Sequence, residues 1–242
     1  MLHKVFLIEW QKLRHSKLFL AITILPILAA AMGSFNFSQN LDILTNGWYD
    51  FWTQLSLFYA YFFYPCLIGL YCAYVCRLEH TRNNWNAVFT APISYTAIFI
   101  GKFSIVACLS LITQLFIGLL YLLCGYLLGI EGTFPPQFYM WLLLGWIGSL
   151  AASGFLLCTS LLIRSFALPI GIALAGGIGG LLLLAMGYGV YFPFSLICVG
   201  MNTLNPDIPL SATLLTQTLF NSLLYIVIFA LTGIYALKKF EY

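Results

Sequence analysis

The stretch FSIVACLSLITQLFIGLLYLLCGYLLGI, residues 103–130, separates Lys102 from Glu131 and contains no charged side chain. A helix needs about 20 largely apolar residues to cross the hydrocarbon core of a bilayer. Because that core offers no water to the backbone, a segment that crosses it has to satisfy its own peptide groups as a helix. Residues 103–130 therefore predict a membrane-spanning helix.

The whole chain has the composition of a membrane protein. Of its 242 residues, 62% are apolar and 7% are charged, whereas a soluble domain carries about 25% charged residues. A soluble fold would lack the polar residues needed to cover this much apolar surface. We expect an all-α membrane protein with a single membrane domain over residues 1–242.

The spacing of charged residues predicts six spans. The stretch between Arg164 and Asp207 is too long for one span, and its second half is too rich in Pro, Gly and Asn for two. We expect a short re-entrant or interfacial element within residues 188–213, buried by other helices. The expected spans are residues 18–36, 51–76, 97–128, 138–162, 166–187 and 214–237.

The basic residues predict the orientation, because all ten Lys and Arg fall on one side of this arrangement. Basic residues favour the cytoplasmic side, so both termini are expected there. Lys102 lies just inside the third span and is expected to extend its ammonium to the same interface. The outer segments carry acidic residues only: Asp42, Asp50, Glu131 and Asp207. Six aromatic residues are expected at the outer interface: Trp48, Tyr49, Trp52, Phe138, Tyr139 and Trp141.

Residues 1–15 predict an interfacial helix. The apolar residues of one face are Leu2, Val5, Phe6, Trp10 and Leu13, and the residues that avoid it are Lys4, Gln11, Lys12 and His15. A cleaved signal peptide has a similar basic start and apolar core. The amphipathic pattern instead favours a helix that leads into the first span.

Several kinds of chemistry have no support in the sequence. The seven cysteines are scattered, nearly all in apolar runs, so neither a disulfide framework nor a metal site is expected. No ionisable residue lies in the middle of a span to relay protons, and no GxxxxGK[ST] phosphate loop is present. We expect no enzyme activity, cofactor or nucleic-acid partner for this chain. Any transport work must draw its energy from another chain.

One cytoplasmic connection is large enough to be informative, and it reads RLEHTRNNWNAVFTAPISYT over residues 77–96. Trp85, Val88 and Phe89 form an apolar patch at helical spacing, and Pro92 ends the pattern. This predicts a short amphipathic helix across the mouth of the second and third spans. Such a helix serves either as an anchor among lipid headgroups or as the contact for a cytoplasmic partner.

The N-terminal helix, the six spans and this loop together resemble the ABC-2 type permeases. In that family the loop is the coupling helix, which docks on a separate ATP-binding subunit. The resemblance implies a docking role for Arg77, Glu79, His80, Arg82, Asn84, Trp85, Phe89 and Pro92. Within this set, Trp85 and Phe89 are expected to be the apolar anchors that enter a groove of the partner.

A narrower resemblance points to the permeases of lantibiotic self-protection transporters in Gram-positive bacteria. It is carried by WYDFWTQ at 48–54, YFFYPCLIGLYCAY at 61–74, LEHTRNNWN at 78–86, APIS at 91–94 and NTLNPD at 202–207. It implies two permease chains, identical or paralogous, with two ATPase subunits that hold ATP and magnesium. The assembly would expel an amphiphilic cationic peptide from the lipid of the cytoplasmic membrane.

The sequence allows alternatives for the packing of the fifth span and for the function. The fifth span carries Gly176, Gly177 and Gly180, which let another helix approach closely, either within the chain or in a second permease. The second-permease reading makes these three the candidate permease–permease contact. The alternative functions are an ABC-2 permease for a drug, lipid or glycan, and a membrane assembly or sensor subunit.

Overall fold

The computed structural model describes residues 2–14, 16, 18–81 and 84–239, and every regular element in these ranges is a helix. The predicted all-α class is confirmed. The elements are α1 (Leu2–Leu13), α2 (Leu18–Gln39), α3 (Gly47–Phe58), the π-helical η1 (Tyr59–Phe63), α4 (Tyr64–His80), α5 (Trp85–Thr90), α6 (Tyr95–Leu127), α7 (Phe138–Leu162), α8 (Ala167–Ala185), the 3-10 helix η3 (Gly189–Tyr191), α9 (Ser195–Gly200) and α10 (Ala212–Lys239).

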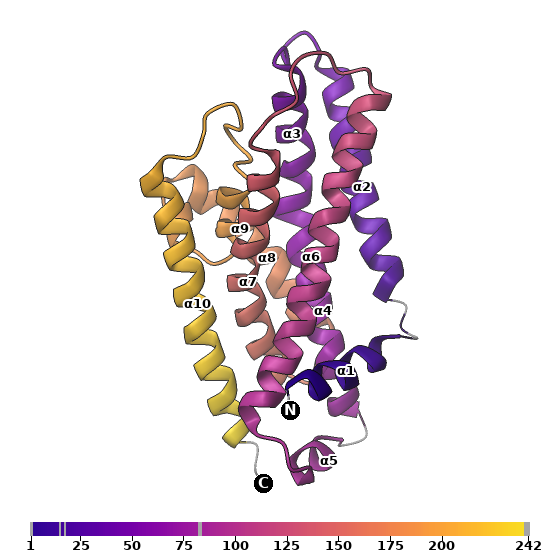
Figure 1. The fold of residues 1–242 in the computed structure, drawn as a ribbon, viewed down its shortest axis with the longest axis vertical. Coiled ribbons are helices and arrows are strands. Elements are labelled where there is room, and N and C mark those ends of the chain that lie inside the picture. The colour runs from indigo at the N-terminus through magenta and orange to yellow at the C-terminus, as the bar shows by residue number, and fades with distance from the viewer. Residues whose placement is uncertain (1, 15, 17, 82–83, 240–242) are drawn as a thin grey trace.

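Six helical segments are long and apolar enough to cross a membrane, as predicted. They are Leu18–Gln39, Gly47–His80, Tyr95–Leu127, Phe138–Leu162, Ala167–Ala185 and Ala212–Lys239. The second span runs continuously through α3, η1 and α4. An even number of spans returns the chain to its starting side, and both ends of the chain lie at the same end of the bundle (Figure 1).

The second span is longer than the charge spacing predicts. It begins at Gly47 rather than at residue 51 and ends at His80 rather than at residue 76. The Asp50 carboxylate accepts a hydrogen bond from the Asn46 backbone N–H at 2.7 Å. Arg77 and His80 occupy the last turn. Acidic residues in the first turn and basic residues in the last turn stabilise a helix, so the charges extend the helix beyond the apolar stretch.

The π-helical segment η1 lies in the middle of the second span, just before Pro65. Proline has no N–H, so the Tyr61 carbonyl loses the donor that an α-helix would place four residues later. Gly177 of α8 sits against that carbonyl oxygen, and a Cβ atom at residue 177 would clash with it. The close approach of these two spans therefore requires glycine at 177.

Two further glycines of α8, Gly176 and Gly180, also contact the chain itself. A Cβ atom at Gly176 would lie 2.8 Å from the Phe194 ring, and one at Gly180 would lie 3.2 Å from the Ser195 nitrogen. Gly177 and Gly180 are buried. Contacts within the chain thus already occupy Gly176, Gly177 and Gly180, which favours packing within the chain. Their role in a permease–permease contact stays a prediction.

The segment between the fifth and sixth spans returns into the bundle, in agreement with the expected re-entrant element. All six residues of α9 are buried, and Gly200 packs directly on the Leu144 carbonyl of α7. The indole N–H of Trp52 donates to the Met201 carbonyl at 2.9 Å. This bond satisfies one of the carbonyls that a helix C-terminus leaves without a partner.

Most of the aromatic residues predicted at the outer interface lie inside the bundle instead. Trp48, Trp52, Phe138 and Trp141 are buried, whereas Tyr139 is 75% exposed. Trp52 stacks on Trp141 with ring centroids 5.1 Å apart. Because the Trp52 N–H has a carbonyl partner within the protein, these rings fill the outer part of the core rather than lie among headgroups.

Two short helices lie at the end of the bundle that holds the termini. α1 runs across the base of the upright spans, and α5 lies beyond it (Figure 1). α1 packs mainly on α6, and its buried residues are Val5, Glu9 and Leu13. The predicted amphipathic N-terminal helix is present, and a carboxylate lies in the centre of its buried face.

Labelling with a membrane-impermeant thiol reagent tests the orientation. On a cysteine-free background, single cysteines at Thr45, Thr133 and Asn205 should react in intact cells, because all three residues are exposed. They belong to the connections α2–α3, α6–α7 and α9–α10, which lie away from the end that holds α1 and α5 (Figure 1). Cysteines at Asn86 and Ser165 should react only after permeabilisation. Labelling of Asn86 from outside would contradict the cytoplasmic placement of α5.

Candidate functional site

Lys102 is the centre of an ionic cluster at the base of the bundle, formed by Glu9, Lys12, Glu79 and Lys102. Its side chain is 0% exposed. The ammonium lies 3.2 Å from Glu9 Oε2 and 2.8 Å from Glu79 Oε1, and it donates to the Val75 carbonyl at 2.8 Å. The third span is thereby linked to α1 and to the end of α4.

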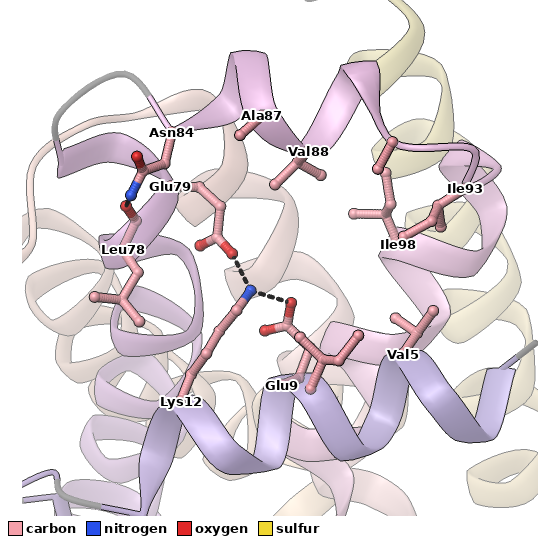
Figure 2. Close-up of a pocket in the computed structure, with 12 residues that line it drawn as sticks. Val5, Glu9, Lys12, Leu78, Glu79, Asn84, Ala87, Val88, Ile93 and Ile98 are labelled. Carbon is pink, nitrogen blue, oxygen red and sulfur yellow. Dashed lines mark hydrogen bonds and ion pairs between the residues drawn. The ribbon is translucent and has the colours of Figure 1, made fainter.

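Lys12 completes the cluster from the partly exposed side. Its ammonium lies 2.7 Å from Glu9 Oε1 and 2.7 Å from Glu79 Oε1, and Figure 2 shows it extended between the two carboxylates. The two lysines and two glutamates balance in charge. Transfer of a charged side chain from water into the protein interior costs several kcal/mol, and close ion pairing with hydrogen bonds has to offset this cost.

The expectation that Lys102 reaches the membrane interface is wrong. Its ammonium turns into the protein because Glu9 and Glu79 offer charged partners there. The sequence does contain an indication of this pairing, because Glu9 interrupts an apolar face formed with Val5 and Leu13. An acidic residue on a buried face and a basic residue inside a span each raise the free energy of the folded state when unpaired, and their pairing lowers it.

A cavity of about 400 Å³ lies between α1 and α5, beside the cluster. Figure 2 shows α1 on one side of it, with Val5 and Glu9, and Ala87 and Val88 of α5 on the other. Its lining residues are Val5, Ile8, Glu9, Lys12, Leu78, Glu79, Asn84, Ala87, Val88, Ala91, Ile93 and Ile98. The walls are largely apolar, and Glu79 Oε2 has no hydrogen-bond partner among the described residues.

The predicted short amphipathic helix is present as α5, with its apolar side turned toward the bundle. Trp85, Val88 and Phe89 are partly buried against the core. Trp85 stacks on Phe89 at 5.4 Å between ring centroids. Asn86 and Ala87 are exposed. The residues expected to anchor an ATPase therefore pack against their own chain, whereas Asn86 and Ala87 are open to solvent.

The remaining predicted docking residues differ in how far they are used within the chain. Glu79 is 2% exposed and belongs to the ionic cluster, so its carboxylate is used within the chain. Asn84 precedes α5 and donates to the Leu78 carbonyl at 3.0 Å. Pro92 is exposed directly after the helix. Arg82 lies outside the described residues.

His80 and Arg77 connect the end of α4 to other elements. The Trp85 indole N–H donates to His80 Nδ1 at 3.2 Å, and His80 Nε2 lies 2.7 Å from the Ser160 carbonyl of α7. With Nδ1 accepting, Nε2 is the ring nitrogen that donates. The Arg77 guanidinium lies over the Phe166 ring at 5.0 Å. A movement of α5 would thus displace His80 of α4 and, through it, the contact with Ser160 of α7.

The comparisons with known proteins bear on this end of the molecule. A family model described as "ABC-2 family transporter protein" matches residues 5–180, which include most of α1, all of α5 and the whole ionic cluster. The chain belongs to the ABC-2 transporter family. It is a membrane permease subunit of an ABC transporter, and membership implies association with an ABC ATPase subunit. Comparisons with curated proteins and with solved structures give no match.

Substitution of Lys102 tests the ionic cluster. Lys102→Met should lower the free energy of unfolding of the purified permease by about 3–5 kcal/mol, because Glu9 and Glu79 lose their buried partner. A thermal-unfolding curve in detergent would report this loss. Lys4→Met, on the exposed side of α1, is the matched control and should change stability by less than about 0.5 kcal/mol.

A rescue experiment separates the charge from the volume of the side chain. Lys102→Met combined with Glu9→Gln and Glu79→Gln removes the unpaired carboxylates and should recover much of the lost stability. If the single substitution is harmless, or if the triple variant is no better than the single one, the cluster does not hold α1 to the bundle.

Proposed function

We propose that this permease works in an ATP-driven exporter that removes an amphiphilic cationic peptide from the membrane and expels it outward. The observation that carries the coupling part of this proposal is the ionic cluster. It joins α1 to α4 and α6 beside α5, so that force applied to α5 by a cytoplasmic subunit reaches the second and third spans. ATP and magnesium would bind to that subunit, present in two copies.

The exposed side of α5 is the proposed docking surface for the ATPase. Asn86, Ala87 and Thr90 are exposed there, and Ala87 also lines the cavity between α1 and α5. The cavity has apolar walls of a kind that accept one aliphatic or aromatic side chain of a partner. Trp85 and Phe89 then act by fixing the orientation of α5 rather than by entering the partner.

A second permease, identical or paralogous, is proposed to contact the outer side of α8. Gly171 and Ala175 are exposed on this side, and no described residue lies within 4 Å of a Cβ position at Gly171 or Gly179. Residues 171, 175 and 179 repeat at one-turn spacing, which allows close approach of another helix in lipid. We prefer this surface as the candidate contact to Gly176, Gly177 and Gly180, which already contact their own chain.

The cargo is inferred from charge and environment, together with the resemblance to lantibiotic self-protection permeases. Asp42, Glu131 and Asp207 are exposed at the outer end and would attract a cationic substrate. The large exposed apolar residues along α2 and α10 suit a substrate already dissolved in the bilayer. The same resemblance leads us to propose the cytoplasmic membrane of a Gram-positive bacterium as the location of the protein.

Substitutions on α5 test the docking surface. Ala87→Arg should weaken the complex with the ATPase by about 30-fold, because a charge in a docking interface costs roughly 2 kcal/mol when it finds no partner. Quantitative co-purification of the two subunits would measure the loss. Ala87 is exposed, so membrane insertion and expression should stay at the wild-type level.

The control is Lys238→Ala, at the same end of the bundle on α10. It should retain the ATPase. If Ala87→Arg also retains the ATPase while Lys238→Ala loses it, docking does not use α5.

Reconstitution tests the cargo. The permease and its ATPase in anionic liposomes should hydrolyse ATP at least about threefold faster with a cationic lantibiotic, since substrate binding couples to the ATPase through the permease. The same peptide with acetylated lysines should give little stimulation. Equal stimulation by both peptides would contradict charge-based selection, and stimulation by a lipid or glycan alone would assign a different cargo.

A further inference from the structure

A second cavity lies at the same end of the bundle, on the side of α4 that faces α7 and α8. Its volume is about 160 Å³, enough for a phosphate group. Its lining residues are Ala73, Arg77, His80, Thr81, Ser160, Ile163, Arg164, Ser165 and Phe166. The cavity is separate from the one between α1 and α5, and none of its lining residues belongs to the ionic cluster.

Among the residues that the structure describes, the lining of this cavity includes two guanidinium groups and no carboxylate. Arg77 and Arg164 are 87 positions apart in the sequence, and both are exposed. All ion pairs within the described part of the chain involve Lys12 or Lys102. The nearest acid in sequence, Glu79, is committed to those lysines. The positive charge at this cavity is therefore not neutralised by the described residues.

The local geometry leaves the donors of Arg77 available. Its guanidinium lies over the Phe166 ring at 5.0 Å from the centroid. An aromatic ring accepts no conventional hydrogen bond from the guanidinium, whose planar set of N–H donors suits a bidentate acceptor such as a phosphate. The Phe166 ring thus holds Arg77 in place at the mouth of the cavity.

A buried hydroxyl provides an independent observation. Ser160 is 1% exposed, and its Oγ has no hydrogen-bond partner among the described residues. The Ser160 carbonyl is already occupied by His80 Nε2 at 2.7 Å. A buried hydroxyl without a partner costs free energy unless a ligand or water accepts its hydrogen bond. The cavity that Ser160 lines therefore has room for an acceptor that the chain does not supply.

We propose that this cavity binds the phosphate of an anionic phospholipid from the inner leaflet. Exposed apolar side chains lie next to it, with Leu162 57% and Leu168 44% exposed, so acyl chains can continue from the bound headgroup along α7 and α8. Basic pockets between spans on the cytoplasmic side are suited to anionic headgroups. A headgroup with an ammonium would bring a third cation to Arg77 and Arg164, which excludes zwitterionic lipids as the preferred ligand.

This site is independent of the proposed cargo and of ATPase docking on α5. A lipid held between α4, α7 and α8 bridges the second, fourth and fifth spans at the membrane surface. It also assigns Arg77 to a lipid contact in place of the ATPase contact implied by the family resemblance.

Native mass spectrometry of the full-length permease, titrated with phosphatidylglycerol and with phosphatidylcholine, tests the proposal. The wild-type chain should prefer phosphatidylglycerol, and Arg77→Gln with Arg164→Gln should weaken its binding by about tenfold or more. Ser160→Ala should weaken it by about threefold. Lys238→Gln with Lys239→Gln removes the same charge from the same end of the bundle and should change binding by less than about twofold.

Each remaining outcome is decisive. Equal affinity for the two lipids, or equal loss in the arginine and lysine double variants, overturns the proposal. Binding of free glycerol phosphate as tight as that of the lipid assigns the cavity to a soluble phosphate instead. Loss of the ATPase with lipid binding intact assigns it to the subunit interface. If the double variant does not fold, Arg164→Gln alone, in an exposed loop position, decides by the same measurement.

Discussion

A lysine ammonium that is closed off from solvent needs charged partners, and Lys102 obtains them from two other helices. Glu9 comes from α1 and Glu79 from the end of α4. An unpaired charge in this position would cost several kcal/mol, so α1 is held in one place across the base of the bundle. The cavity between α1 and α5 and the adjoining ends of the second and third spans are built around this pairing.

Close contact between backbones fixes the spans relative to one another farther from the base. In lipid there is no hydrophobic force between helices, and packing depends on shape. Pro65 leaves the Tyr61 carbonyl without its helical donor, and Gly177 allows α8 to lie directly on that carbonyl. Gly200 does the same for α9 against α7. The re-entrant segment is thus part of the core rather than a surface loop.

At the end of the bundle that holds α1 and α5, the two proposed sites lie on different sides of α4. One side of α4 carries Glu79 into the ionic cluster and the cavity below α5, where mechanical work from an ATPase would enter. The other side presents Arg77 to a cavity shared with Arg164 and bordered by lipid-facing leucines. Both sites use the last two turns of the same helix, so a movement of α4 would change both.

The six spans, the common side of the termini, the amphipathic N-terminal helix and the short helix near Trp85 could be predicted from the sequence alone. Lipid as a solvent makes span length and charge placement local properties, which single segments reveal. Which residues contact one another within the chain was decided only by the tertiary structure. Lys102 turns inward because Glu9, 93 residues away, is folded against it, and Trp85 and Gly177 face their own chain for the same kind of reason. Which side of a helix is covered depends on residues distant in sequence, and no local pattern contains that information.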